Sequence, residues 1–339
     1  MIREPAFWWR DGTGGLLIPF AVIYGAAAAL RMERRGRKSD LPVICLGNLT
    51  VGGAGKTPAA LAVAQLLLAA HQQPFFLSRG YGGRLAGPVR VNPAVHRAGD
   101  VGDEPLLLTR LAPTVVARDR VAGAKFAQFA GASVVVMDDG LQNGSLAKDL
   151  SVVVVDGRRG IGNGHIVPAG PLRAPLGLQF ARAQALLIVG PIDRAAGLLE
   201  RARRHGLAVF HGRLEPDRGV VDAIGRRKAL AFAGIGDPEK FFATLGACGI
   251  DVVERASFPD HHRYSAAEAK DLIARAQAKN LMLVTTEKDQ ARLAGEPELE
   301  ALAARTSALP VRLVIEEQDA FRQMLLQAVT PNRNQPPRA

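Results

Sequence analysis

The sequence predicts an α/β fold with a doubly wound, mainly parallel sheet, followed by a second, smaller α/β domain. Three observations predict it. Short runs rich in Val, Ile and Leu alternate with helical stretches, a glycine-rich loop joins the first such run to a helix, and the alternation restarts near residue 191. Strands that alternate with helices form parallel sheets with helices on both faces.

The elements are expected in the following order. In the first unit, strands are predicted at 43–46, 75–77, 114–117, 134–137, 152–155 and 186–189, with a helix at 58–70. In the second unit, helices are predicted at 194–205, from Asp237-Pro238-Glu239 onward and at 265–279, with strands at 230–233, 282–285 and 311–315. We therefore divide the chain into an N-terminal segment (1–38), a main domain (39–190), a smaller domain (191–325) and a disordered tail (326–339).

The N-terminal segment combines an apolar run with aromatic and basic flanks. Trp8 and Trp9 precede the uncharged run 15–30, and the residues after it carry basic side chains at spacings of one helical face: Arg31, Arg34, Arg35 and Lys38. Indoles favour the headgroup zone of a bilayer, and basic clusters favour anionic lipid phosphates. The run is shorter than the ~20 residues of a spanning helix. A signal peptide and a buried core helix are alternatives, but we favour a helix on a membrane surface.

Charge and cysteine content narrow the function classes. The 339 residues carry a formal net charge of +11, which attracts nucleic acid, anionic lipids and phosphorylated substrates alike. Aromatic residues make up only 5% of the chain and both Trp residues lie at the N-terminus, so no stacking platform for nucleic acid is expected. Cys45 and Cys248 form no disulfide framework, which is typical of a reducing compartment.

A glycine-rich loop follows the first expected strand and precedes the first expected helix. It reads Thr50-Val51-Gly52-Gly53-Ala54-Gly55-Lys56-Thr57, which indicates the P-loop of an NTPase, although the strict pattern has Gly at position 50. Backbone N–H groups of such a loop bind phosphates, the lysine reaches the β- and γ-phosphates, and the hydroxyl binds Mg²⁺. A glycine-rich turn with a chance GKT is the alternative. We expect ATP and Mg²⁺ as cofactors.

Two acidic residues follow the expected strand 134–137. A carboxylate at the end of a strand beside the P-loop holds Mg²⁺ directly or through water, which favours Asp138 as a metal ligand and Asp139 as a second candidate. Asp-Gly sequences also favour turns, which is the alternative.

Two further sites carry candidate chemistry. Asp103 precedes an apolar helix, where it is either an N-cap or a functional carboxylate. His261 and His262 are adjacent, and neighbouring residues of an extended segment face opposite sides, so only one is expected to enter a site. Neither Cys nor a third His stands near them in sequence, so a zinc site is not expected.

Seven motifs occur in a fixed order: GNLTVGGAGKTP, SRGYGG, VGDEP, DDGLQ, GNGHIVPAGPLR, FPDHHRY and TTEKD. Through them the chain resembles, over roughly residues 5–320, the tetraacyldisaccharide 4'-kinase family, the lipid A 4'-kinases of Gram-negative bacteria. It departs from the family pattern at Asn143, where a His is usual, and at Lys148, where Arg is frequent.

The resemblance implies that ATP phosphorylates the 4'-hydroxyl of a tetraacylated glucosamine disaccharide 1-phosphate, a lipid A precursor. It implies that Asp103 is the catalytic base and that one His of the DHH run is its partner, at a cleft between the two domains that closes on ATP. It also implies a membrane-contacting N-terminal helix, a peripheral or monotopic location on the cytoplasmic face of the inner membrane, and an anionic membrane surface as a partner. Neither an obligate protein partner nor nucleic acid is expected.

A P-loop GTPase is the main rival. Guanine recognition normally uses an N/T-K-x-D run, and Thr286-Glu287-Lys288-Asp289 comes near to it. Its Lys and Asp are adjacent, so the spacing is wrong by one residue, and we favour ATP.

Overall fold

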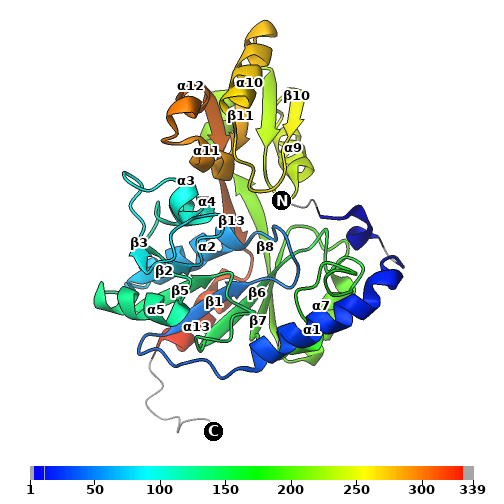
Figure 1. The fold of residues 1–339 in the computed structure, drawn as a ribbon, viewed down its shortest axis with the longest axis vertical. Coiled ribbons are helices and arrows are strands. Elements are labelled where there is room, and N and C mark those ends of the chain that lie inside the picture. Colours follow the sequence, from blue (N-terminus) through cyan, green and yellow to red (C-terminus); the bar gives the residue numbers. More distant parts are fainter. Residues whose placement is uncertain (1–3, 11, 331–339) are drawn as a thin grey trace.

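The computed structural model describes residues 4–10 and 12–330, and its larger part is a nine-stranded sheet with helices on both faces (Figure 1). The strand order is β13-β8-β7-β6-β1-β5-β2-β4-β3, and every neighbouring pair is parallel except those of the two edge strands, β13 and β3. This confirms the predicted fold class. The strands are β1 Val43–Gly47, β2 Pro74–Ser78, β3 Val89–Arg90, β4 Thr114–Val116, β5 Val134–Asp138, β6 Leu150–Asp156, β7 Ala185–Val189, β8 Ala208–Pro216 and β13 Val311–Ile315.

The central strands β1, β5 and β6 are buried along their whole length, as expected for strands covered on both faces. Phe321 and Leu325 of the C-terminal helix join the core cluster that contains Val63 and Leu67 of the helix after β1, which ties the end of the chain to the middle of the sheet. The helices of this larger unit are α1 Ile18–Glu33, α2 Lys56–Ala69, α3 Ala98–Val101, α4 Asp103–Leu108, α5 Arg120–Phe129, α6 Leu176–Ala181, α7 Ala196–Arg204 and α13 Gln318–Val329, with short 3-10 turns η1 Ala6–Trp9 and η2 Gly15–Leu17.

A second, four-stranded parallel sheet forms a small unit on top of the large one, with strand order β10-β9-β11-β12. We call the segment from α8 to β12 the small unit and the rest the large unit. Its elements are α8 Arg218–Ile224, β9 Ala229–Ala233, α9 Pro238–Ala247, β10 Val252–Ser257, α10 Ala266–Ala278, β11 Met282–Thr286, α11 Glu287–Leu293, η3 Pro297–Leu299, α12 Glu300–Ala303 and β12 Thr306–Leu309.

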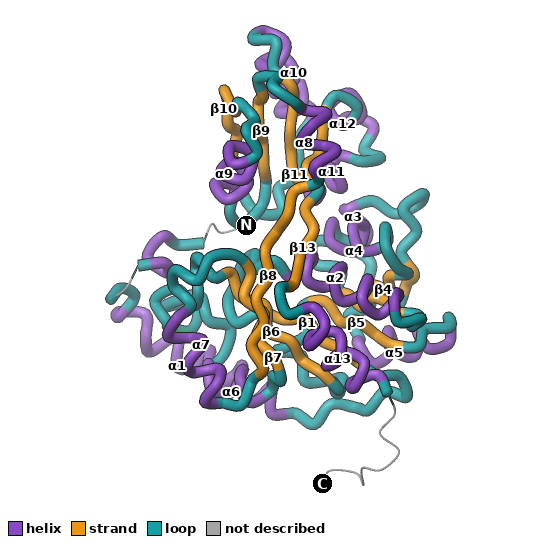
Figure 2. The backbone as a smooth tube through the Cα atoms, turned by 180° about the vertical axis from the view of Figure 1, so that it is seen from behind, coloured by secondary structure: helices purple, strands orange, loops and turns teal. Residues whose placement is uncertain are grey.

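Two strands join the units. β8 and β13 pair antiparallel, with Leu313 opposite Leu214, at the edge of the large sheet, and they run side by side toward the small unit (Figure 2). The sequence placed residues 191–325 in the smaller domain, whereas the structure puts β8, β13 and α13 in the large unit. Helix α13 ends at Val329, so the predicted disordered tail begins within a helix, and its residues 331–339 lie outside the described part of the chain.

Helix α1 lies on the surface of the large unit (Figure 1). Its apolar side chains are largely uncovered. Leu16, Phe20, Val22, Ile23 and Leu30 are between 62% and 95% exposed, so the core-helix alternative does not hold. With η2 it forms one helix, Gly15–Glu33, with a mean hydropathy of 1.7, and by length and composition alone this helix could cross a membrane, whereas the uncharged run 15–30 was predicted to be too short.

Two details of the predicted N-terminal segment are wrong. The helix ends at Glu33, so of the four basic residues only Arg31 is helical. The next residues turn extended because Arg37 pairs with the 145–147 segment: its N–H donates to the Ser145 carbonyl over 2.9 Å. Trp8 is buried and donates to the Pro168 carbonyl, and Trp9 lies under the Arg159 guanidinium at 3.8 Å, so both indoles contact protein.

Candidate active site

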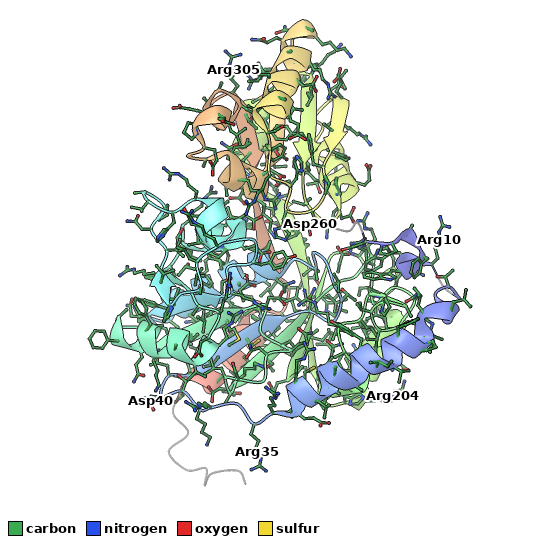
Figure 3. All side chains as sticks on the ribbon, viewed as in Figure 1. Arg10, Arg35, Asp40, Arg204, Asp260 and Arg305 are labelled. Carbon is green, nitrogen blue, oxygen red and sulfur yellow. The ribbon has the colours of Figure 1, made fainter. Side chains whose placement is uncertain are left out.

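A cavity of about 2080 Å³ lies between the two units, at the carboxyl ends of β1 and β5. The carboxyl edge of a parallel sheet is the usual position for a ligand site. Asp260, which lines the cavity, lies where the small unit meets the large one (Figure 3). Charged side chains of both signs line it: basic residues that include Lys56, Arg79, Arg118, Arg120, Arg173 and Lys288, and acidic residues that include Glu104, Asp138 and Asp139.

The glycine-rich loop spans residues 48–55, between β1 and α2. Gly52 and Gly55 have φ values of +96° and +85°, which favour glycine. Asn48 Nδ2 donates to the carbonyls of Thr50 (2.7 Å) and Gly52 (3.1 Å), and Arg173 Nε donates to the Thr50 carbonyl (2.9 Å). These bonds hold the loop open at the amino end of α2, the arrangement that binds phosphates.

Lys56 and Thr57 are the first two residues of helix α2. Both line the cavity although they are mostly buried. Lys56 Nζ is 3.8 Å from Asp139 Oδ2. The Thr57 hydroxyl is 3.5 Å from Oε1 of Glu104, a carboxylate to which the sequence prediction gave no role. Lysine, hydroxyl and carboxylates are thus gathered at one end of the loop.

The two acidic residues after β5 have different surroundings. Asp138 is 1% exposed, and neither of its carboxylate oxygens has a hydrogen-bond partner. Burial, reinforced by the charge of Glu104, raises the pKa of Asp138 to about 7. An unpartnered buried carboxylate that lines the same cavity as the Thr57 hydroxyl fits a divalent cation. Asp139 instead bonds Arg173 Nη1 over 2.7 Å, and Lys56 and Arg173 outweigh burial and lower its pKa to about 2.

Asp103 begins α4, where Gly102 and not Asp103 is the N-cap residue, so the plain capping alternative does not describe it. It is 4% exposed and does not line the cavity. Its Oδ1 accepts the Glu104 N–H over 2.9 Å, and its Oδ2 accepts from Arg292 Nε over 2.7 Å. Burial acts to raise the pKa of Asp103, but His261, Arg292 and Lys288 outweigh burial and hold it well below its usual range.

The two histidines occupy different sites. His261 lines the cavity, with Nδ1 3.2 Å from Asp103 Oδ2 and Nε2 3.8 Å from Asp260 Oδ2. His262 turns away, bonds Glu268 over 3.0 Å and stacks on Phe258. The segment is a turn and not an extended strand, because His261 has a φ of +54°. Still, only one histidine faces Asp103.

Residues of several motifs meet at this cavity, some without a role in the sequence prediction. Lys288 Nζ forms a salt bridge with Glu104 over 2.6 Å. Arg292 forms an ion pair with Asp103 across the interface between the units. Lys288 lies in the TTEKD motif, but no pattern in the sequence predicts its contact with Glu104. Arg292 stands three residues after Asp289, a spacing that puts both on one helical face and that could have drawn attention to it.

Comparisons with known proteins agree along almost the whole chain. The model of the family described as Tetraacyldisaccharide-1-P 4'-kinase matches residues 14–330. The chain is 52% identical over 326 residues to Tetraacyldisaccharide 4'-kinase of Rhodopseudomonas palustris (strain BisA53), covering 96% of this chain and 95% of that protein. It is also 52% identical over 322 residues to the enzyme of the same name of Methylobacterium sp. (strain 4-46), covering 94% and 95%.

A solved structure is similar as well. The crystal structure of LpxK from Aquifex aeolicus in complex with ATP superposes with a TM-score of 0.73 at 27% sequence identity, covering 94% of this chain and 99% of that one. The P-loop, the unpartnered Asp138 and His261, which pairs with the buried Asp103, therefore line or adjoin one cavity, in a chain that matches these relatives over almost its whole length. This chain belongs to the tetraacyldisaccharide 4'-kinase family.

Proposed function

We propose that this protein transfers the γ-phosphate of ATP to the 4'-hydroxyl of a tetraacylated glucosamine disaccharide 1-phosphate, a step of lipid A biosynthesis. The observation that carries the proposal is that the P-loop and His261, which pairs with the buried Asp103, line one cavity. Phosphoryl transfer needs a phosphate cradle, positive charge at the transferred group and a group that receives the hydroxyl proton. The arginine and lysine side chains that line the cavity also suit an acceptor that carries a phosphate.

The direct test is transfer of label. The full chain in detergent micelles is incubated with γ-labelled ATP and the disaccharide 1-phosphate, and the lipids are separated by thin-layer chromatography. We expect the label in a more polar lipid whose formation requires both substrates. Label found only in free phosphate would make the chain an ATPase and contradict the proposal.

We assign proton removal to Asp103 and His261 acting together. The sequence interpretation made Asp103 the base and a histidine its partner. The burial of Asp103 behind His261 supports the reverse order in this conformation: His261 Nε2 takes the hydroxyl proton while Asp103 orients the ring through Nδ1 and stabilises the imidazolium. In either order the two residues work as one unit.

The order of the two residues predicts a pH dependence. Burial acts to lower the pKa of His261, but the hydrogen bond and charge of Asp103, helped by Asp260, raise it above its ordinary 6.5. A histidine base must be neutral, so kcat/KM should fall as the pH drops through this raised pKa, with half of the activity lost above pH 6.5. The pH profile of kcat/KM for the acceptor measures this. Activity that persists down to pH 4 would instead indicate that Asp103 is the base, because its lowered pKa keeps it ionised at that pH.

We further propose that the nucleotide is bound as its Mg²⁺ complex. Thr57, Asp138 and Glu104 carry the oxygen atoms that would hold the cation, and Mg²⁺ would neutralise charge that develops on the phosphates. Asp139 is a weaker candidate because Arg173 already occupies its Oδ1.

Asp138→Asn is expected to raise the Mg²⁺ concentration needed for half-maximal activity by ~10-fold or more, because the amide removes a negative charge from the cation site. Asp139→Asn should have the smaller effect. Titration of activity with Mg²⁺ at fixed ATP measures both, and a smaller shift for Asp138→Asn than for Asp139→Asn would reverse the assignment.

We also propose that helix α1 contacts an anionic membrane surface on the cytoplasmic face of the inner membrane, where ATP is present. The support is the uncovered apolar side of α1 together with the exposed basic residues that follow it, Arg34, Arg35, Arg37 and Lys38. Each basic residue near an anionic surface contributes ~1 kcal/mol to binding.

Val22→Glu together with Ile23→Glu should weaken vesicle binding by ~10-fold or more, because each side chain loses apolar burial of ~1.5 kcal/mol or more. ATP affinity should stay unchanged. Co-sedimentation with anionic and neutral vesicles measures the loss, and Val253→Glu, an exposed valine of the small unit, is the matched control. Equal binding by the α1 variant and the control would place the membrane contact elsewhere.

A further inference from the structure

Arg292, on α11 of the small unit, reaches across the interface between the units. It contacts Asp103 itself and a backbone carbonyl that also binds His261. Its Nε donates to Asp103 Oδ2 over 2.7 Å, and its Nη2 donates to the same oxygen. Its Nη1 donates to the carbonyl of Gly234, and that carbonyl also accepts the His261 backbone N–H over 3.1 Å. One guanidinium therefore fixes the carboxylate directly and shares an anchor with the histidine.

The guanidinium is itself held in place by buried groups. Asp289, 0% exposed, accepts from Arg292 Nη1 over 2.7 Å, from the Tyr264 hydroxyl over 3.0 Å and from the Thr286 hydroxyl over 2.6 Å. Its two oxygens also accept the Gly234 N–H, both over 3.1 Å. These contacts hold the planar guanidinium in one orientation, in which the edge formed by Nε and Nη2 contacts Asp103.

We propose that Arg292 is a positioning residue for the phosphoryl transfer: by clamping Asp103 and the Gly234 carbonyl, it sets the Asp103–His261 geometry, and it does so only when the small unit is seated on the large one. The inference rests on the proposed function of that pair. It makes Arg292 the link between closure of the cavity and assembly of the catalytic pair, since Asp103 belongs to the large unit and Arg292 and His261 to the small one.

A purely structural ion pair is the competing explanation. Buried ion pairs contribute little net stability compared with apolar side chains of similar size, because both charges lose their hydration. A second arginine also crosses the interface: Arg97, the residue before α3, donates through Nε to the carbonyl of Gly295, two residues beyond α11, over 3.0 Å. Arg97 joins the two units without touching Asp103 and does not line the cavity, which makes it the matched control.

The test compares Arg292→Gln, Arg292→Lys and Arg97→Gln in the full chain, each alone and with Asp103→Asn, by kcat, by KM for ATP and by melting temperature. We expect Arg292→Gln to lower kcat by ~10²-fold, the cost of misplacing a reacting group by about 1 Å, with KM for ATP within ~2-fold of the parent. Arg292→Lys should recover part of the loss, because it keeps the charge but not the fork. Added to Asp103→Asn, Arg292→Gln should cause no further loss. Arg97→Gln should leave kcat nearly unchanged.

Three results would overturn the inference. Losses that multiply in the double variant would make Arg292 merely structural, as would a lower melting temperature with unchanged kcat. Full kcat in a folded Arg292→Lys variant would show that the fork geometry of the guanidinium is not needed. If Arg292→Gln does not fold, the kcat of Arg292→Lys alone decides whether Arg292 positions the pair. Failure of the proposed function looks different, because Asp103→Asn alone would then keep its turnover.

Discussion

Lys56→Ala is expected to reduce phosphoryl transfer by on the order of 10³-fold, because it removes the positive charge at the transferred group. Lys56 is buried at the start of α2 and points into the cavity beside Asp139, so no neighbouring lysine can replace it from the loop. Thr57→Ala should cause a comparable loss, because its hydroxyl is a candidate ligand for the cation. Initial rates of labelled lipid formation measure both losses, and circular dichroism checks the fold.

Lys125→Ala is the control for this experiment, because Lys125 is an exposed lysine on α5, another helix of the large unit. Its turnover should equal that of the parent. Near-normal turnover of Lys56→Ala in a folded protein would remove the P-loop from the reaction and with it the proposal of a P-loop kinase.

Asp103→Asn is expected to lower kcat by ~10² or more, because an amide can neither accept a proton nor stabilise an imidazolium at His261. The substitution keeps the size of the side chain and an oxygen for the Glu104 N–H. It also removes one of the two carboxylate charges that pair with the buried Arg292, so the melting temperature should fall. Rates are therefore measured well below that temperature, and KM for ATP should stay close to the parent value.

The histidines supply a matched pair for the same experiment. His261→Ala should resemble Asp103→Asn, whereas His262→Ala should keep most of its turnover, because His262 bonds Glu268 and stacks on Phe258 away from the cavity. A strong defect in His262→Ala with a weak one in His261→Ala would exchange their assigned roles.

Much of the fold could be predicted because the central strands are short, apolar runs that stand out in the sequence. The runs at β1, β5, β6 and β7 are nearly all Val, Ile and Leu, as burial on both faces requires, and the helix starts at Asp237 and Ser265 carry their capping residues. β8 gave no such signal, because AVFHGRLEP is a partly exposed strand with polar residues throughout. Missing β8 is why the strand at 311–315, which pairs with it, was assigned to the small unit.

The site divides in the same way. Loop and strand-end residues such as Lys56, Thr57 and Asp138 could be predicted, because short-range patterns place them at the edge of the sheet. The contacts of Asp103 with Arg292, and of Glu104 with Lys288, join residues more than 180 positions apart, and no local pattern contains them. The headgroup role inferred for Trp8 failed for a similar reason, because its partner, the Pro168 carbonyl, lies 160 positions away.

The central claim is that Asp103 and His261 act as one unit on a hydroxyl held opposite the P-loop. A double-mutant cycle on kcat tests it most directly, with Asp103→Asn, His261→Ala and the combined variant assayed for label transfer to the disaccharide acceptor. Residues that act as a unit give grossly non-additive losses, so we expect the combined variant to be about as slow as the slower single variant. Losses that multiply in the combined variant would show two independent contributions and contradict the claim.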